Sequence, residues 1–557
     1  MFSILTSVFN FTFGLLWDKV RDVTADKLQE GDLTDQKCRE FIVRELDDIT
    51  TKLDGLARKD LLSSISFLKE GLCLVNFAIQ KVTDNEEAKE EEDEKEVEVE
   101  AWCILNHSGN FVVYETWPLV LPEAAKKLKI TSQESFASAK ASFKAAREKT
   151  TEAFNNEALC IEDRILATKL RMISRILESL EDPDPTAETC KLCIKELHDV
   201  PAVKEMFTVY LNGGIKSHFN KRKRLEIMVM SVNMINFVLY DFICKFTKLP
   251  LNLFYWPRIK IGDSTYHPIL ENSDIMGNVK QSGGPRPIKQ SIGYVYSCSV
   301  NSKREIVAWD NTSRDIKVLN TTTSEWRLFC TLSDEMIGPN VIKVWKIYSA
   351  IAVDGDDNVY IVVTFQTSDD VYHYTLFVFG IIGNLKYISA LEFLNENKRF
   401  FNTRLVLSKD RSIIHRDGEK NVWVCDHRGQ LKYKFPVKTE SYMYLMQPTI
   451  SVSDKNEIIA AERRGRSVYI YTEGEMKRTI KVSESHEIFG VVFNHITKTI
   501  IVGTWLKNSY FLSSYSKTGE QQDTLEIPFR NPSVLVKIIS HPSGHVVFVQ
   551  GRHIIFI

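Results

Sequence analysis

Two short clusters in the sequence carry residue types that bind metal ions. Cys190-x-x-Cys193 is followed by His198, but a structural zinc site needs four ligands and no second pair follows. Asp354-Gly-Asp-Asp-Asn358 begins like a calcium loop, yet Phe365 stands where the bidentate glutamate belongs. We therefore interpret the cysteines as packed side chains on one helix face and the Asp-rich segment as a turn. The sequence predicts no metal site and no cofactor.

Two basic clusters are candidate partner-binding sites. They consist of Lys221, Arg222, Lys223 and Arg224, and of Arg463, Arg464 and Arg466. Either cluster could contact phosphate, so RNA is one candidate ligand, although no aromatic platform for stacking bases is evident beside them. Short basic patches are usually solvated surface, and the net charge of −2 gives the whole chain no attraction to nucleic acid.

The first segment, residues 2–29, predicts a helix with an aromatic stripe that could contact a membrane interface. Its candidate membrane-contact residues are Phe9, Phe13, Leu16 and Trp17. The segment is too short, and too polar at Asn10 and Asp18, to span a bilayer. The alternative is that this stripe packs into the chain's own helical bundle, as amphipathic helices usually do.

Sequence motifs of common enzyme classes are missing from the chain. There is no Walker A loop, no Gly-x-Ser-x-Gly, no His-Glu-x-x-His and no Gly-x-Gly-x-x-Gly after a strand. We therefore predict a protein that is not an enzyme. The ten cysteines are scattered, and the N-terminus lacks the basic region and cleavage site of a secretory signal, so we expect a cytoplasmic location.

The N-terminal half, residues 1–255, predicts a helical bundle. Near-heptad seams typical of coiled coils run from Ile42 to Leu56 and from Leu61 to Val82, which favours packing within the chain and leaves dimerisation as the alternative. The most hydrophobic segment, 225–246, contains Asn233 and Asn236, so we interpret it as the central buried helix rather than a membrane span. An acidic linker is predicted at 86–100, with the frayed end of a helix as the alternative, and a small inserted β-hairpin is predicted at 102–117.

The C-terminal half, residues 291–557, predicts a six-bladed β-propeller. A polar turn followed by a β-branched apolar run occurs six times, with the runs 42 to 54 residues apart. The runs begin near Ile306, Val359, Ile413, Ile458, Ile500 and Val546. Since the chain ends just after the third strand of the sixth repeat, residues 256–290 are predicted to be a linker that supplies a closing strand.

The repeats resemble those of NHL-repeat propellers. The resemblance is carried best by IAVDGDDNVYIVV and FVFGIIGNLKYI in the second repeat, and it covers about half of the chain. A helical region followed by such a propeller resembles a group of uncharacterised invertebrate NHL-type proteins. Tripartite-motif ubiquitin ligases also end in NHL propellers, but no Cys/His series of a zinc-binding RING precedes the helices here.

Three functions follow as hypotheses. The first is a non-enzymatic scaffold or sensor, in which the propeller recognises a protein partner and the helical domain recruits or self-associates. The alternative is a membrane-active, pore-forming-like helical domain controlled by the propeller, with peripheral membrane contact. The third and weakest is RNA binding through a basic propeller face.

Overall fold

The computed structural model of the chain forms two compact units, a helical one and a β-propeller. Residues that contact one another group into a helical unit of residues 1–249 and 256–284 and a propeller unit of residues 250–255 and 285–557. The structure describes residues 8, 43–44, 46–51, 53, 56–93, 117–212, 221–249, 251–270, 297–310, 313–320, 325–337, 341–367, 372–394, 404–416, 421–438, 448–462, 464–507, 509–528, 536–550 and 553–557. The prediction of an acidic linker is wrong for residues 86–93, which belong to the helix Lys59–Asp93, and residues 94–100 lie outside the described residues. The predicted hairpin, up to residue 116, also lies outside them.

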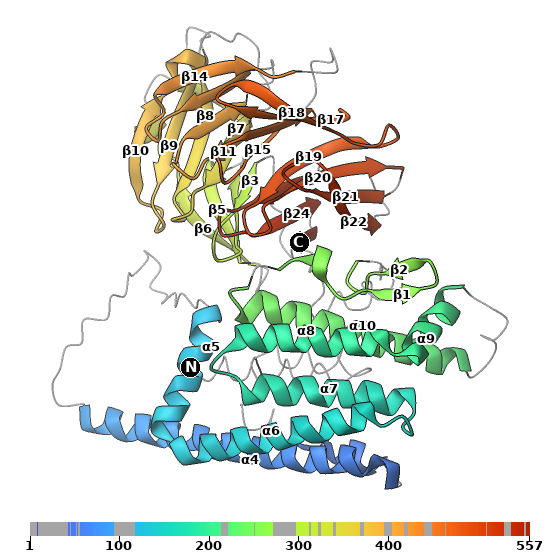
Figure 1. The fold of residues 1–557 in the computed structure, drawn as a ribbon. Helices are drawn as coiled ribbons and strands as arrows, with labels where there is room; N and C mark the ends of the chain where they lie inside the picture. The colour runs from blue at the N-terminus through green and yellow to red at the C-terminus, as the bar shows by residue number, and fades with distance from the viewer. Residues whose placement is uncertain are drawn as a thin grey trace. The chain divides into compact units, whose positions relative to one another are not determined.

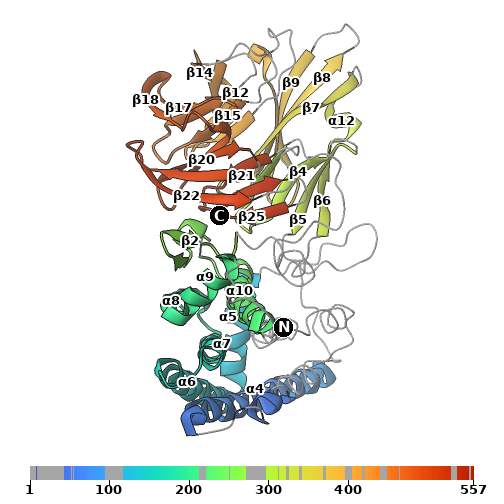
Figure 2. The same cartoon turned by 90° about the vertical axis from the view of Figure 1, so that its right-hand side faces the viewer.

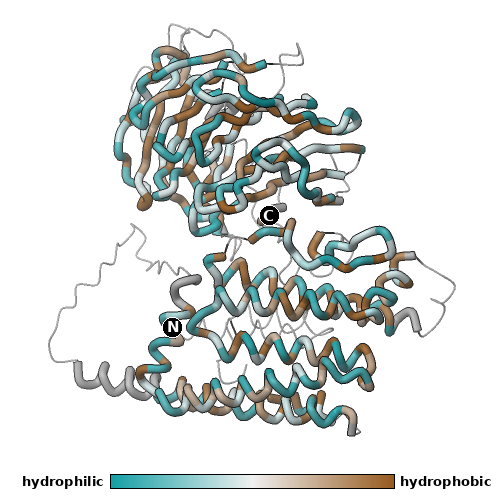
Figure 3. The backbone as a smooth tube through the Cα atoms, in the orientation of Figure 1, coloured by the Kyte–Doolittle hydropathy of each residue, from teal (hydrophilic) through white to brown (hydrophobic). Residues whose placement is uncertain are grey.

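The helical unit is a layered bundle (Figure 1). Its described elements are η1 (Leu56–Arg58), α4 (Lys59–Asp93), α5 (Trp117–Thr131), α6 (Gln133–Asn155), α7 (Ile161–Glu178), α8 (Pro183–Asp199), α9 (Pro201–Asn212), α10 (Lys221–Phe246), β1 (Ile259–Ile261) and β2 (Ser264–Tyr266). Helix α6 packs between α4 and α7, and α8 packs on α7 and α10. Apolar positions recur along these helices (Figure 3), as expected for elements that each bury one face.

Both long apolar helices lie where the sequence predicts them. The predicted seam of α4 is buried at Leu61, Ile65, Leu68, Leu72, Val75 and Ile79. Helix α10 is packed over most of its surface, and 72% of its most apolar window is buried, against 44% for the corresponding window of α4. The two helices, over Arg224–Phe246 and Lys59–Lys81, are also long and apolar enough to cross a membrane by length and composition alone. The burial of α10 agrees with its interpretation as the central helix of the bundle.

The second unit is a propeller of six blades, each a separate antiparallel sheet (Figures 1 and 2). The first blade consists of β3 (Cys298–Val300), β4 (Ile306–Asp310), β5 (Asp315–Asn320) and β6 (Glu325–Thr331), and the second of β7 (Val341–Val353), β8 (Val359–Thr367), β9 (Tyr372–Phe379) and β10 (Leu385–Ala390). The third consists of β11 (Arg404–Leu407), β12 (Ile413–Arg416), β13 (Asn421–Cys425) and β14 (Leu431–Pro436), and the fourth of β15 (Pro448–Val452), β16 (Ile458–Glu462), β17 (Ser467–Thr472) and β18 (Glu475–Lys481). The fifth consists of β19 (Glu487–Asn494), β20 (Thr499–Leu506), β21 (Ser509–Tyr515) and β22 (Gln521–Pro528), and the sixth of β23 (Val536–Ser540), β24 (Val546–Gln550) and β25 (His553–Phe556). Short helical turns α12 (Asp334–Ile337), η3 (Leu253–Tyr255) and η4 (Glu392–Leu394) accompany them.

The first strands of the blades form a closed ring. Strand β3 contacts β7, and the contacts continue through β11, β15, β19 and β23 back to β3. The middle strands are sandwiched between neighbouring blades, so they are buried on both faces; β4, for example, is buried throughout. One such core joins Trp309 of the first blade to Ile361 and Phe379 of the second. Burial on both faces explains the continuous apolar runs of the sequence.

The closing strand stays a prediction. Among the described residues the sixth blade has three strands, β23 to β25. Within the segment 256–290, strands β1 and β2 pair with each other, with Ile259 opposite Tyr266. The remaining residues of that segment, from 271 onward, lie outside the described part of the chain.

Candidate functional site

The two ends of the propeller differ in the turns they carry. In every blade the first strand runs into the second through a tight turn at one end, which we call the turn end. The opposite end, where the first strands begin and the second strands finish, is called the mouth end. Strand order in the sheets fixes these two ends for all six blades.

At the turn end, polar side chains satisfy their own turns. Asp354 Oδ1 accepts the backbone N–H groups of Asp356 and Asn358, both at 2.9 Å. Asn301 and Ser453 accept equivalent bonds in the first and fourth blades. The calcium-like segment Asp354–Asn358 is therefore a blade turn, as the sequence predicts, because its first carboxylate is occupied by its own backbone.

Contacts between neighbouring turns occupy the turn end further. Ser302 donates to Asp357 from its backbone N–H, at 2.8 Å, and from its hydroxyl, at 2.5 Å. Asp454 pairs with Lys517 at 2.9 Å and with Lys498 at 3.3 Å. The charged groups of this end are thus largely engaged with one another.

Two histidines of the sixth blade join the turns of the first and second blades. His541 Nε2 lies 2.9 Å from the Asp354 carbonyl oxygen and 3.5 Å from Asp357 Oδ1. His545 Nε2 lies 3.2 Å from the Ser302 carbonyl oxygen. Burial lowers the pKa of His541, and it lowers the pKa of His545 to about 3, so both rings are neutral in the native state near pH 7.

Inside the ring, the first strands line a central channel whose hydroxyl groups hold neighbouring blades together. Thr449 Oγ1 accepts the Val491 N–H at 2.9 Å, and Ser451 Oγ accepts the Phe493 N–H at 2.8 Å. Ser297 Oγ accepts the Ile351 N–H in the same way at 2.9 Å. The innermost strand of a blade is an edge, and these hydroxyls satisfy backbone donors that its own sheet leaves open.

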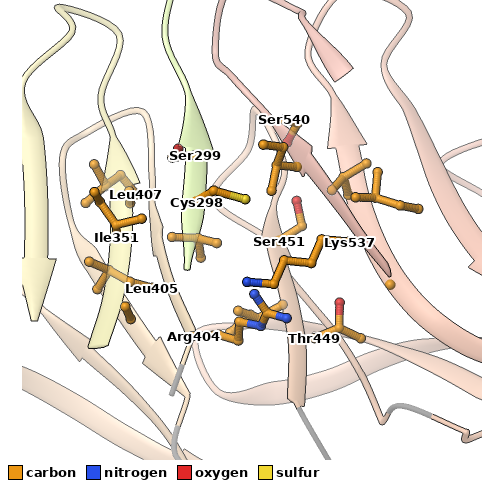
Figure 4. A pocket seen from close by; sticks show the side chains of 18 of the residues that line it. Cys298, Ser299, Ile351, Arg404, Leu405, Leu407, Thr449, Ser451, Lys537 and Ser540 are labelled. Atoms are coloured by element: carbon orange, nitrogen blue, oxygen red, sulfur yellow. The ribbon is translucent and has the colours of Figure 1, made fainter. Parts of the chain in front are cut away.

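Two cationic side chains extend into this channel at its mouth end (Figure 4). Arg404 is the first residue of β11 and is half-buried, whereas Lys537 is the second residue of β23 and only 5% exposed. Their blades, the third and the sixth, occupy opposite positions in the ring. The channel space is about 90 Å³, and its described lining also includes hydroxyl and aliphatic side chains such as Ser451 and Leu405. In the view of Figure 4, the Arg404 and Lys537 side chains point toward the same part of the channel.

Sequence reasoning missed Arg404 and Lys537. Arg404 begins the otherwise apolar strand RLVL of the third blade, and Lys537 interrupts the strand VKIIS of the sixth. A charged residue within such a run is a usable signal, because charged side chains are rarely placed inside apolar strands without a role. The two strands are far apart in the sequence, so only the closed ring brings the residues to one channel.

The predicted basic clusters lie elsewhere. Arg464 and Arg466 are exposed in the turn between β16 and β17 at the mouth end, while Arg463 lies outside the described residues. Arg464 Nε lies 3.9 Å from Glu487 Oε2, and its guanidinium carbon lies 5.9 Å from the centre of the Trp505 ring. An aromatic ring therefore stands beside this cluster, which the sequence did not reveal. No observation tests whether the cluster binds a partner.

The second basic cluster forms the first turn of α10. Lys221, Arg222 and Lys223 begin that helix, and Arg224, which is exposed, pairs with Glu162 of α7. The predicted membrane-contact residues, Phe9, Phe13, Leu16 and Trp17, lie outside the described part of the chain. Both assignments stay predictions.

The Cys190-x-x-Cys193 pair packs within the helical unit. Both thiols are buried on α8, and burial raises the pKa of each, which keeps the thiols protonated. His198 faces α10 instead, with Nε2 3.0 Å from Asn236 Nδ2. Among the described residues, no group of three or more His, Cys, Asp or Glu side chains has the arrangement of a metal site.

Asn236 is the centre of a buried polar cluster in the helical unit. Its Oδ1 accepts the Trp256 Nε1–H at 2.9 Å, and its Nδ2 donates to the Val232 carbonyl at 2.8 Å. Burial lowers the pKa of His198 to about 3, so the neighbouring ring is neutral. Near it, Asn233 Nδ2 lies 3.4 Å from the Tyr266 hydroxyl. The cluster fixes the segment after α10 onto α8 and α10.

Comparison with known proteins assigns no family. No protein-family model matches the chain, and no curated protein matches it. The resemblance to NHL repeats accordingly stays a prediction. The fold itself, a six-bladed propeller preceded by a helical region, follows from the strand order.

Solved structures with propellers are similar to the chain at low identity. Virginiamycin B lyase from Staphylococcus aureus is 12% identical over 48% of this chain and 85% of its own, with a TM-score of 0.30. The aldose sugar dehydrogenase from Streptomyces coelicolor is 9% identical over 48% and 90%, with a TM-score of 0.32. A chain in the mitotic checkpoint complex is 11% identical over 48% and 89%, with a TM-score of 0.33. We draw nothing about this chain from similarities at this level.

Proposed function

We propose that this chain is a non-enzymatic, NHL-type interaction protein of the cytoplasm, in which the mouth end of the propeller recognises a protein partner. The helical unit, in this proposal, recruits further components or self-associates. The observation that carries the proposal is the pair Arg404 and Lys537, which extend from opposite blades into one channel. A few polar groups converging in a largely apolar cavity are typical of binding sites.

The difference between the two ends of the propeller supports the choice of the mouth end. The turn end is engaged in contacts within the chain, such as those of Asp354, Asp357 and Asp454. A partner that bound at the turn end would have to break these contacts first, which would lower its binding energy. Arginine is also enriched among residues that dominate interface energies.

The hydroxyls in the channel support binding rather than catalysis. Thr449, Ser451 and Ser297 each accept a backbone N–H of the neighbouring blade. A nucleophilic hydroxyl would instead be positioned against a general base. These three groups thus act as structural bridges within the channel wall.

The proposal is tested by quantitative capture from cells that make the protein. The tagged full chain, the double variant Arg404→Gln/Lys537→Met and the control Lys455→Gln are compared. Lys455 is an exposed cation of the turn end, so its loss controls for a general change of charge. We expect the wild type and the control to retain the same proteins, and the double variant to lose at least one of them by about ten-fold or more.

The result that contradicts the proposal is equal retention by all three folded chains. Folding is checked in each chain by circular dichroism and urea unfolding. If Lys537→Met lowers stability, Arg404→Gln alone tests the loss of capture, and Lys537→Arg, which keeps the charge, must preserve capture.

A further inference from the structure

The turn between the first two strands of the sixth blade begins with a histidine. In four other blades that turn begins with a residue whose side-chain oxygen accepts N–H groups of the turn: Asn301, Asp354, Ser453 and Asn494. His541 occupies the same position in the sixth blade, since its N–H donates to the carbonyl four residues on, as that of Asp354 does. A ring that can take up a proton therefore stands where these blades have a short polar side chain.

The hydroxyl of Ser543 lies against this ring. Ser543 is exposed at the turn end, and its Oγ lies 2.7 Å from His541 Nδ1. The backbone N–H of Ser543 donates to the same nitrogen at 3.1 Å, which is the contact that closes the turn. The hydroxyl contact is additional to that structural role.

The other ring nitrogen determines the tautomer of His541. Its Nε2 lies 2.9 Å from the Asp354 carbonyl oxygen, which can only accept a hydrogen bond. Nε2 therefore carries the ring hydrogen, and the Ser543 hydroxyl donates to the unprotonated Nδ1. Burial lowers the pKa of His541, so the ring is neutral near pH 7 and is able to accept the hydroxyl proton.

A carboxylate stands on the far side of the ring. Asp357 Oδ1 lies 3.5 Å from His541 Nε2, and both side chains are buried. Ser302 holds Asp357 in place by donating to it from its backbone N–H and its hydroxyl. A negative charge at this position stabilises the imidazolium that forms when the ring takes a proton. Hydroxyl, imidazole and carboxylate thus follow one another in the order that activates a serine.

We propose that Ser543 is a nucleophile that accepts one acyl group from an activated acyl donor, an aryl ester or a thioester. Ser543 Oγ attacks the acyl carbon while its proton passes to His541 Nδ1, and the bond from that carbon to the leaving oxygen or sulfur breaks. The leaving group departs as an anion, and the imidazolium gives its proton to water. The product is an ester on Ser543. The inference goes beyond the proposed function and does not depend on it, because it concerns the turn end.

The turn favours a single acyl transfer over repeated turnover. The N–H groups of Ser543 and Gly544 both bond to His541, so they are engaged and do not form an oxyanion hole. An activated donor depends less on such stabilisation, because its leaving group departs readily. The exposed Ile496 side chain lies next to Gly544, which gives a short aliphatic acyl chain an apolar neighbour.

Reaction of the purified full chain with p-nitrophenyl butyrate tests the proposal. Release of p-nitrophenolate gives the rate, and mass spectrometry of peptides identifies the acylated residue. The wild type is compared with Ser543→Ala, His541→Asn and the control Thr518→Ala. Asparagine closes the corresponding turns of the first and fifth blades, so His541→Asn keeps the turn and removes the base. Thr518 is an exposed turn hydroxyl that pairs with Ser516 instead of a histidine.

We expect the wild type and Thr518→Ala to acquire one butyryl group on Ser543. In His541→Asn this acylation is expected to be about a hundred-fold slower, which is the size of a general-base contribution. Ser543→Ala is expected to lose it. The wild type unfolded in urea keeps the sequence of the turn without the fixed contacts, and its Ser543 is expected to react at least about ten-fold more slowly than in the folded chain.

Three outcomes overturn the inference. They are no acylation of Ser543 in the folded wild type, acylation of Ser543 no faster than that of Thr518, and an unchanged rate in His541→Asn. Folding of each variant is checked by circular dichroism. If His541→Asn does not fold, the folded and unfolded wild type are compared instead, and equal rates at Ser543 overturn the inference.

Discussion

Acid is expected to destabilise the propeller through His545, which joins the sixth blade to the first. Its Nε2 lies 3.2 Å from the Ser302 carbonyl oxygen, and its side chain is almost fully buried. Burial, with Arg304 as the next contribution, lowers the pKa of His545 from 6.5 to about 3. The native protein therefore binds this proton far less readily than the unfolded chain does.

The sign and size of the effect follow from linkage. Above pH 6.5 the ring is neutral in both states, so its full contribution to stability is present there. As the pH falls from 6.5 toward 3, the unfolded chain gains a proton that the native state excludes, and stability is lost. At pH 5, which is about 1.5 pH units below the pKa of the unfolded chain, the expected loss in the free energy of unfolding is about 2 kcal/mol.

The variant His545→Gln removes this titration and keeps a donor for the Ser302 carbonyl. Urea unfolding is carried out at pH 7.5 and at pH 5.0. The unfolded fraction is measured by a brief hydrogen-exchange pulse at one common pH and mass spectrometry of peptides from 536–550. These peptides report the unfolding of the propeller alone. The wild type is expected to lose about 2 kcal/mol more than the variant between the two pH values. His427→Gln, at an exposed turn of the third blade, is the control and is expected to behave as wild type.

A pH effect of equal size in the wild type and His545→Gln would refute this reasoning. His541 is present in both chains, and burial lowers its pKa as well. Because the charge of His541 also lowers the pKa of His545, the difference between the two chains reports the titration of His545 together with its interaction with His541.

Three further substitutions test contacts in the two units. Thr449→Val removes the acceptor of the Val491 N–H in the channel wall, and we expect a loss of about 1–3 kcal/mol in urea unfolding of propeller peptides. Asn236→Leu leaves the buried Trp256 Nε1–H without its acceptor, and we expect about 2–5 kcal/mol in peptides of the helical unit. Gly544→Ala puts a side chain at φ 93° with its Cβ 2.0 Å from Ile496 Cγ1, and we expect about 1–3 kcal/mol.

Matched controls accompany these variants. Thr479→Val changes an exposed threonine of the same blade as Thr449 and is expected to cost less than about 0.5 kcal/mol. Adding Ile496→Ala to Gly544→Ala removes the steric contact and should recover part of the loss. If the Thr449→Val variant were as stable as the Thr479→Val variant, the claim that the Thr449 hydroxyl stabilises the contact between neighbouring blades would be contradicted. Wild-type stability of Asn236→Leu would contradict the importance of the buried cluster.

The propeller could be predicted because its middle strands are buried on both faces. That burial demands continuous apolar runs, and a polar turn precedes each run. The predicted starts Ile306, Val359, Ile413, Ile458 and Val546 are the first residues of β4, β8, β12, β16 and β24. The predicted start at Ile500 lies one residue inside β20. Periodic burial was therefore readable from the sequence.

Helix α5 was not predicted, since prolines mask it. Pro118 lies in its first turn and Pro122 within it, and prolines argue against a helix in any local reading of sequence. The helix forms because Leu121 and Leu128 are buried where α5 packs on α4, α6 and α10. Tertiary packing outweighs local preference here.

The candidate site could not be predicted because it depends on closure of the ring. Arg404 and Lys537 stand in short strands that carry no recognisable spacing motif. The buried cluster of His198, Asn236 and Trp256 likewise joins three separate segments of the chain. Sites of this kind become visible only once the topology is known.

The most direct test of the central claim is a map of where the partner touches the propeller. A photoreactive amino acid replaces Arg466 at the mouth end in one full-length chain and Lys455 at the turn end of the same blade in another. Crosslinking in cells is followed by mass spectrometry of the joined peptides. We predict that a partner is joined at position 466 and not at 455, and that Arg404→Gln/Lys537→Met removes the product. Crosslinks from position 455 alone, or crosslinks from 466 that persist in the double variant, would contradict recognition at the channel mouth.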